Sequence, residues 1–238
     1  MRAIGQAVLA ATVFGVVGMA ASTEALAVPQ TTALQTASSG ANVATDFSTS
    51  LTVNKFNPSL GTLTDVLITL NGTVVANFKA ESLDASPTTI TMTSKATETL
   101  SSGVLTLTQV LPTNSTTFNA SAYDGTFDNA GTSGTIVTGL TGTASSGVQD
   151  LTAPAVLSAF TGIGAADTIS LTLAASGLSS GVGGGNLITQ INTFASGNVA
   201  VQYKYNPAAP VPEPASMTLL GAGLVGLGAI ARRRGKKA

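Results

Sequence analysis

The side chains that could take part in chemistry in this chain are carboxylates and hydroxyls, because the sequence contains no His and no Cys. Their absence excludes an imidazole base, a thiol nucleophile, disulfide bonds and the usual zinc sites. Residues 28–210 carry four Lys against nine acidic residues, a net charge of −5, which does not favour nucleic acid as a partner. The nine acids are Asp46, Asp65, Glu81, Asp84, Glu98, Asp124, Asp128, Asp150 and Asp167. No spacing pairs two of them for catalysis, so we expect solvated surface acids, no cofactor, no metal site and no enzymatic activity.

One loop gathers several oxygen-bearing side chains, with Asp124, Asp128 and Asn129 placed around Gly125. Calcium binds side chains of this kind, but the spacing matches neither an EF-hand nor a nonapeptide repeat. Asp and Asn in such a loop also bond to their own backbone and form turns. We expect a turn here, and calcium binding is the alternative.

Hydroxyl side chains make up about a quarter of the chain, with 36 Thr and 23 Ser among 238 residues. The pattern Thr-x-Thr recurs, for example at Thr89, Thr91 and Thr93. A regular array of Thr on a flat sheet is one way to bind ice, but these spacings follow no fixed period. Because Thr combines a preference for strands with solubility, we expect solvated strand faces, with ice binding as a lesser alternative.

The N-terminus has the order of a secretory signal peptide. A basic start is followed by the apolar stretch 3–21 and the polar step 22–24. The small residues Ala25 and Ala27 then predict cleavage by signal peptidase before Val28. We therefore expect residues 1–27 to be removed and the remaining chain to be exported.

The C-terminus combines three features in a fixed order. A short motif, Val211, Pro212, Glu213 and Pro214, precedes a stretch of 17 residues without charge, 215–231. Five basic residues follow, which are Arg232, Arg233, Arg234, Lys236 and Lys237. As a helix the uncharged stretch would be about 25 Å long, just enough for a bilayer core. The sequence predicts a transmembrane helix over 215–231 and a basic stop-transfer tail over 232–238 that stays cytoplasmic.

This order of features resembles the PEP-CTERM sorting signal of Gram-negative bacteria, which also occurs under an ice-binding C-terminal label. The resemblance implies that a membrane exosortase recognises residues 211–214 and cleaves nearby. It further implies a precursor held transiently in the inner membrane, and a mature protein at the cell surface or in the extracellular matrix.

Four blocks of the body, 56–74, 122–135, 157–173 and 197–206, resemble the bacterial choice-of-anchor E domain. That family precedes interchangeable C-terminal anchors and has no established activity. The resemblance therefore implies a domain placed before an anchor and leaves its molecular role open.

We expect the elements that position these features to be strands. Apolar and hydroxyl residues alternate along short segments, and these segments are separated by Gly, Asn, Ser and Pro, which favour turns. The expected strands are 50–56, 62–70, 73–80, 88–100, 104–111, 116–122, 134–137, 155–160, 168–174, 187–194 and 198–205. Asn71-Gly72 between two of them predicts a two-residue hairpin. Residues 28–45 lack periodicity and predict a flexible lead-in, and 207–210 a linker.

The predicted fold is all-β, a single antiparallel β-sandwich over residues 46–206 between a signal-peptide helix and a C-terminal transmembrane helix. We expect a structural or adhesive protein in an exopolysaccharide or biofilm layer. The alternative is a module that binds carbohydrate or another ligand. Its candidate aromatic platforms are Tyr123, Phe127, Tyr203 and Tyr205.

Overall fold

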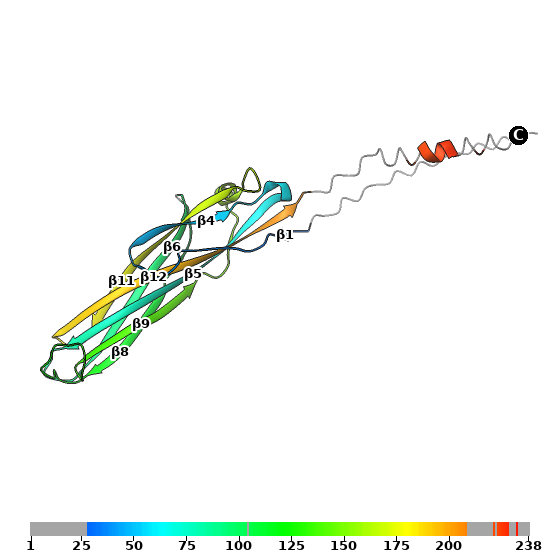
Figure 1. The fold of residues 1–238 in the computed structure, drawn as a ribbon. Coiled ribbons are helices and arrows are strands. Elements are labelled where there is room, and N and C mark those ends of the chain that lie inside the picture. The colour runs from blue at the N-terminus through cyan, green and yellow to red at the C-terminus, as the bar shows by residue number, and fades with distance from the viewer. Residues whose placement is uncertain (1–27, 104, 209–220, 222, 229–231, 233–238) are drawn as a thin grey trace, which may run out of the picture.

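The computed structural model describes residues 28–103, 105–208, 221, 223–228 and 232, and within them the chain forms two antiparallel β-sheets packed face to face (Figure 1). One sheet has seven strands and the other has five. The expectation of an antiparallel, sandwich-like β fold is confirmed.

The seven-stranded sheet is built on two long central strands, β5 (Gly61–Ser82) and β12 (Leu187–Pro207). Along the free side of β12 lie β1 (Gln30–Thr31), β2 (Gln35–Ser38) and β3 (Val43–Ala44). Along the free side of β5 lie β9 (Gly134–Ser145) and β10 (Gln149–Leu151).

The five-stranded sheet has the order β4-β11-β6-β7, with β8 also paired to β6. Its strands are β4 (Phe47–Asn54), β6 (Thr88–Ser102), β7 (Leu105–Val110), β8 (Thr113–Ala120) and β11 (Thr168–Val182). A short 3-10 helix, Pro58–Leu60, precedes β5, and one α-helix, α1 (Pro154–Phe160), precedes β11.

The alternation read from the sequence places the core correctly. Val66, Ile68 and Leu70 of β5 are fully buried, as are Ile90 and Met92 of β6. Because side chains of a strand alternate between faces, the intervening residues point outward. The apolar faces of the two sheets therefore meet in the interior and the hydroxyl-bearing faces lie outside.

The pairing of β5 with β12 gives the sandwich two distinct ends. At one end, which we call the base, Pro207 pairs with Gly61 and Gln30 pairs with Tyr205. The described chain thus enters and leaves the body at the base. At the other end, which we call the tip, the strands are joined by three loops, 83–87, 121–133 and 183–186 (Figure 1, lower left).

The predicted hairpin at Asn71-Gly72 is wrong, because β5 runs unbroken through both residues. Gly72 faces the interior and pairs with Gly197 of β12. A Cβ at Gly72 would lie 2.7 Å from both Glu98 Oε2 and Val110 Cγ2. Glycine at this position therefore allows the two sheets to approach each other closely. The period-two pattern continues through it, and pairing with β12 outweighs the local preference for a turn.

Two other segments differ from the expectation. Residues 28–45, expected to be flexible, contribute β1, β2 and β3, which pair with β12. Residues 155–160, expected to be a strand, lie in α1, where Pro154 starts the helix. Val156 and Phe160 are four residues apart on one helical face and are both buried against the base of the core, which favours the helix.

The predicted signal peptide, with Ala25 and Ala27, lies outside the described residues, as does most of the predicted transmembrane stretch. Of that stretch, residues 221 and 223–228 are helical and exposed. Among the residues that the structure describes, no helix is long and apolar enough to cross a membrane.

Replacing Gly142 by Ala tests the packing of one side of the sandwich. A Cβ there would collide with the backbone carbonyl of Thr113, at the point where β9 of one sheet approaches β8 of the other. Backbone atoms cannot move aside cheaply, so we expect Gly142→Ala to lower the free energy of unfolding by about 2–3 kcal/mol. Urea unfolding measures this, with Gly164→Ala as control because nothing lies within 4 Å of its Cβ. Equal stability of the two variants would contradict the packing.

Candidate functional site

The tip contains two of the four predicted aromatic binding residues, Tyr123 and Phe127, together with the acidic loop around Gly125. Its three loops are tied together by hydrogen bonds. The backbone N–H of Asn186 donates to Asp84 Oδ1 (3.1 Å), and the N–H of Tyr123 donates to the Asp84 carbonyl (2.9 Å). Ser133 donates to Glu81 Oε1 (2.6 Å), which joins the long loop to the end of β5. The tip is thus a hydrogen-bonded platform.

The acidic loop at the tip has the geometry of turns. Asp124 Oδ1 accepts from the N–H of Thr126 (3.0 Å), and Asp128 Oδ1 accepts from the N–H of Ala130 (2.8 Å). Asn129 has a φ of 55°, in the left-handed region that Asn tolerates. Over the described ranges no three Asp or Glu side chains come close enough to hold a metal ion. The geometry favours the turn over the calcium alternative.

The four aromatic candidates separate into two groups. Phe127 is 55% exposed in the tip loop, and Tyr123 is half-buried in the same loop. Tyr203 is 1% exposed at the base, where its hydroxyl donates to the carbonyl of Asn54 (2.6 Å). Tyr205 packs against Phe56, with ring centroids 5.3 Å apart. Tyr203 is therefore not a binding platform, and only the tip offers an exposed aromatic ring from this set.

The expectation that all nine acids are solvated is wrong for two of them. Glu81 and Glu98 have no exposed surface. Glu81 lies beneath the tip loop, and Glu98 lies on the inward face of β6. The burial of Glu98 could have been predicted from the alternation of its strand, because Glu98 shares a face with Ile90, Met92 and Ala96.

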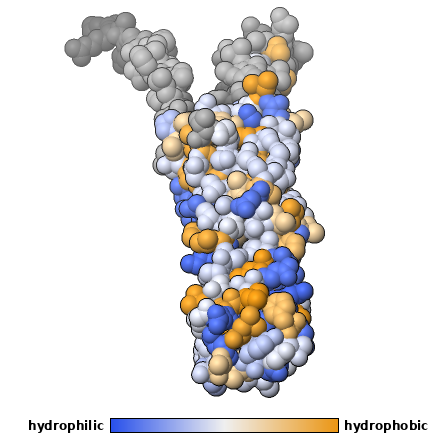
Figure 2. All heavy atoms as spheres, turned by 90° about the vertical axis from the view of Figure 1, so that its left-hand side faces the viewer, coloured by the Kyte–Doolittle hydropathy of each residue, from blue (hydrophilic) through white to orange (hydrophobic). Residues whose placement is uncertain are grey.

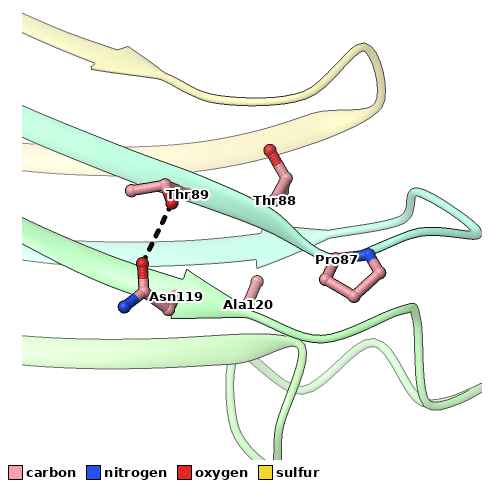
Figure 3. A pocket seen from close by; sticks show the side chains of 5 residues that line it. All are labelled: Pro87, Thr88, Thr89, Asn119 and Ala120. Atoms are coloured by element: carbon pink, nitrogen blue, oxygen red, sulfur yellow. Dashed lines mark hydrogen bonds between the residues drawn. The ribbon is translucent and has the colours of Figure 1, made fainter.

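The Thr-x-Thr run of β6 lies on the outer face of its sheet, as expected for a solvated strand face. Thr89 donates to Asn119 of β8 (3.0 Å), and Thr93 and Ser115 share a hydrogen bond (3.2 Å). Near the tip this edge carries a shallow hollow of about 260 Å³ lined by Pro87, Thr88, Thr89, Asn119 and Ala120 (Figure 3). Some of these hydroxyl groups therefore form hydrogen bonds with polar side chains of the neighbouring strand.

The surface seen from the tip side shows hydrophobic residues in small separate groups among hydrophilic ones (Figure 2, tip at the lower end). Phe127 and Ile136 are among the exposed apolar residues of the tip half. Scattered residues of this kind are ordinary for a protein surface.

The residues predicted for sorting fall mostly outside the described part of the chain. Val28, the predicted new N-terminus, is exposed at the base. Arg232 is described, and is helical and exposed. The motif 211–214 and the basic residues Arg233, Arg234, Lys236 and Lys237 lie outside the described residues.

The PEP-CTERM protein-sorting motif matches residues 210–234 of this chain. This motif implies exosortase-dependent C-terminal sorting of an exported, transiently membrane-anchored protein of Gram-negative bacteria. The resemblance of the C-terminal segment to the PEP-CTERM sorting signal is therefore confirmed.

Known proteins add little about the body. No curated protein matches the chain. Among solved structures, a chain of infectious bursal disease virus, Gt strain, is 12% identical over 85% of this chain and 50% of that one, with a TM-score of 0.14. A chain of the T13 particle of the same virus is 13% identical over 80% and 44%, with a TM-score of 0.13. The chain spans about half the length of these viral chains or less, and the scores are too low to support an argument about fold or function.

Substitution of Tyr203 distinguishes a core residue from a surface platform. Tyr203→Phe removes one hydrogen bond and should cost about 1 kcal/mol, and Tyr203→Ala should cost about 3–5 kcal/mol because it empties a site packed against Phe56 and Phe160. Denaturant unfolding measures both values. Tyr123→Phe at the tip serves as control and should change stability little. A Tyr203→Ala variant as stable as the parent would contradict its place in the core.

Proposed function

We propose that this protein is a non-enzymatic structural or adhesive component of the cell surface or extracellular matrix. An exosortase would cleave it near Pro212-Glu213-Pro214 after a signal peptidase has removed residues 1–27. The observation that carries the proposal is the sorting motif at 210–234 joined to the base of an elongated β-sandwich.

The geometry of the body supports this proposal. The segment leading to the sorting motif leaves the body at the base, where the N–H of Ala208 donates to the Leu60 carbonyl (3.1 Å). A body attached through this segment directs its tip loops away from the point of attachment. A β5 strand of 22 residues corresponds to roughly 70 Å at about 3.3 Å per residue. The protein would hold its tip loops at that distance, within a layer of exopolysaccharide or biofilm matrix.

Mass spectrometry of the mature protein tests the sorting part of the proposal. In cells with an exosortase we expect a new C-terminus near the Pro-Glu-Pro motif and an N-terminus at or near Val28. Replacing both Pro212 and Glu213 by Ala should leave the C-terminus intact, because the recognition element is lost, whereas Pro207→Ala should be processed normally. An intact C-terminus through Ala238 in exosortase-positive cells would contradict the proposal.

A second candidate function is carbohydrate binding at the tip, which the exposure of Phe127 favours. Phe127 lies between Asp124 and Asp128 in the sequence of the tip loop, and all three residues are exposed. An exposed aromatic face near polar groups suits a sugar ring with its hydroxyls. Binding of this kind would attach the tip to the exopolysaccharide while the base carries the sorting segment.

Glycan-array binding tests the tip. We expect Phe127→Ala to reduce glycan binding at least tenfold, because the stacking surface is lost. Ile163→Ala is the matched control, since Ile163 is an apolar residue 97% exposed in the loop after α1 at the base. If the protein binds no glycan, or if both variants bind like the parent, the tip is not a carbohydrate site.

A further inference from the structure

Glu98 is a carboxylic acid placed inside the sandwich, near the middle of β6. It has no exposed surface, and neither of its oxygens has a hydrogen bond of ordinary geometry within the described structure. Buried carboxyl groups are rare unless they are paired, because removal from water disfavours the charged form. The position of Glu98 therefore needs a physical explanation.

The opposite sheet is shaped to receive this carboxyl group. Gly72 of β5 and Gly197 of β12 are paired across the two strands and both face Glu98. A Cβ at Gly72 would lie 2.7 Å from Glu98 Oε2, and a Cβ at Gly197 would lie 2.9 Å from the same atom. Glycine inside a strand weakens the strand and often marks a close approach. Two paired glycines thus form a notch that a side chain on either strand would fill.

Among the residues that the structure describes, none that faces the notch carries a charge that could balance a carboxylate. On its own sheet Glu98 pairs with Ala175 of β11 and Val110 of β7. The opposite sheet contributes Gly72 of β5 and Gly197 of β12. Leu173 of β11, which is on the same sheet as Glu98, lies beside Gly197. None of these facing residues is titratable. Burial raises the pKa of Glu98 to about 7, and the backbone N–H of Thr73 opposes this rise only in part.

We propose that Glu98 is a proton-binding switch that controls how tightly the two sheets pack at the Gly72–Gly197 notch. With its proton bound, the side chain is a neutral group that fits the notch. When the proton is lost, a negative charge without a counterion lies between the sheets, and the packing loosens there. An exported domain meets the pH of its surroundings, so this body is tighter in a mildly acidic layer than in an alkaline one.

The direction of the effect follows from proton linkage. The ordinary pKa of Glu is 4.5, and the pKa of Glu98 in the folded protein is about 7. Between these two pH values the folded state holds a proton that the unfolded state has released. Stability is therefore highest below this window, falls as the pH rises through it, and stays level above it. The difference between the two pKa values corresponds to a change in the folding equilibrium constant on the order of a hundredfold.

Denaturant unfolding of the full chain at pH 5 and pH 8 tests the switch. Tyrosine fluorescence reports the transition, because the chain has no Trp and Tyr203 is buried. We expect the folding equilibrium constant of the parent to fall on the order of a hundredfold between the two pH values. Glu98→Gln should remove most of this fall, because the amide stays neutral. Asp128→Asn, which removes a surface carboxylate and keeps a turn-forming side chain, should retain the parent's fall.

If Glu98→Gln shows the same pH dependence as the parent, the proposal is overturned. Glu98→Leu provides a second neutral side chain in case the Gln variant does not fold. Hydrogen exchange of the parent is independent of any variant. Corrected for intrinsic rates, the amides of β5 and β12 around Gly72 and Gly197 should lose protection at pH 8 relative to those around Phe78. Equal protection of both regions at pH 5 and pH 8 would also overturn the proposal.

Discussion

The antiparallel pairing of β5 with β12 is the constraint on which the rest of the structure depends. The register runs from Ser82–Leu187 at the tip to Gly61–Pro207 at the base, with one irregularity at Lys204/Tyr205. Strands β1–β3 add to one side of this pair, and β9 and β10 add to the other. The length of the pair sets the length of the sandwich, and its two ends become the base and the tip.

A sandwich of this length does not have one uniform core. The base contains large side chains such as Phe56, Phe160 and Tyr203, and the tip half contains Phe78, Ile90 and Met92. Between them lies a cluster of small residues, Val74, Ala96, Ala175 and Ala195, flanked by Glu98 and by hydroxyl groups. Ser94 and Ser179 both lie within hydrogen-bond distance of the Thr193 hydroxyl (2.9 and 2.6 Å). The middle of the body therefore contains small side chains and hydroxyl groups beside a buried carboxyl group.

Local sequence pattern was sufficient for some features and insufficient for others. The alternation around Val66 and Ile90 predicts the buried faces, because burial of one sheet face requires it. Asn71-Gly72 misleads, because the turn preference of two residues competes with a pairing partner more than a hundred residues away. The tip could not be predicted as a site either, since the meeting of loops 83–87, 121–133 and 183–186 depends on strand register. The sorting motif was readable because its three parts are contiguous.

The body is one long sandwich whose base leads to the sorting segment and whose tip loops lie at the far end. Spin labels on Ser59→Cys and Ser86→Cys measure this directly, because both sites are exposed beside the ends of β5 and the chain has no Cys of its own. An unbroken strand of 22 residues predicts a label separation of roughly 70 Å. A hairpin at Asn71-Gly72 would bring the labels within about 25 Å of each other, and that result would contradict an unbroken β5.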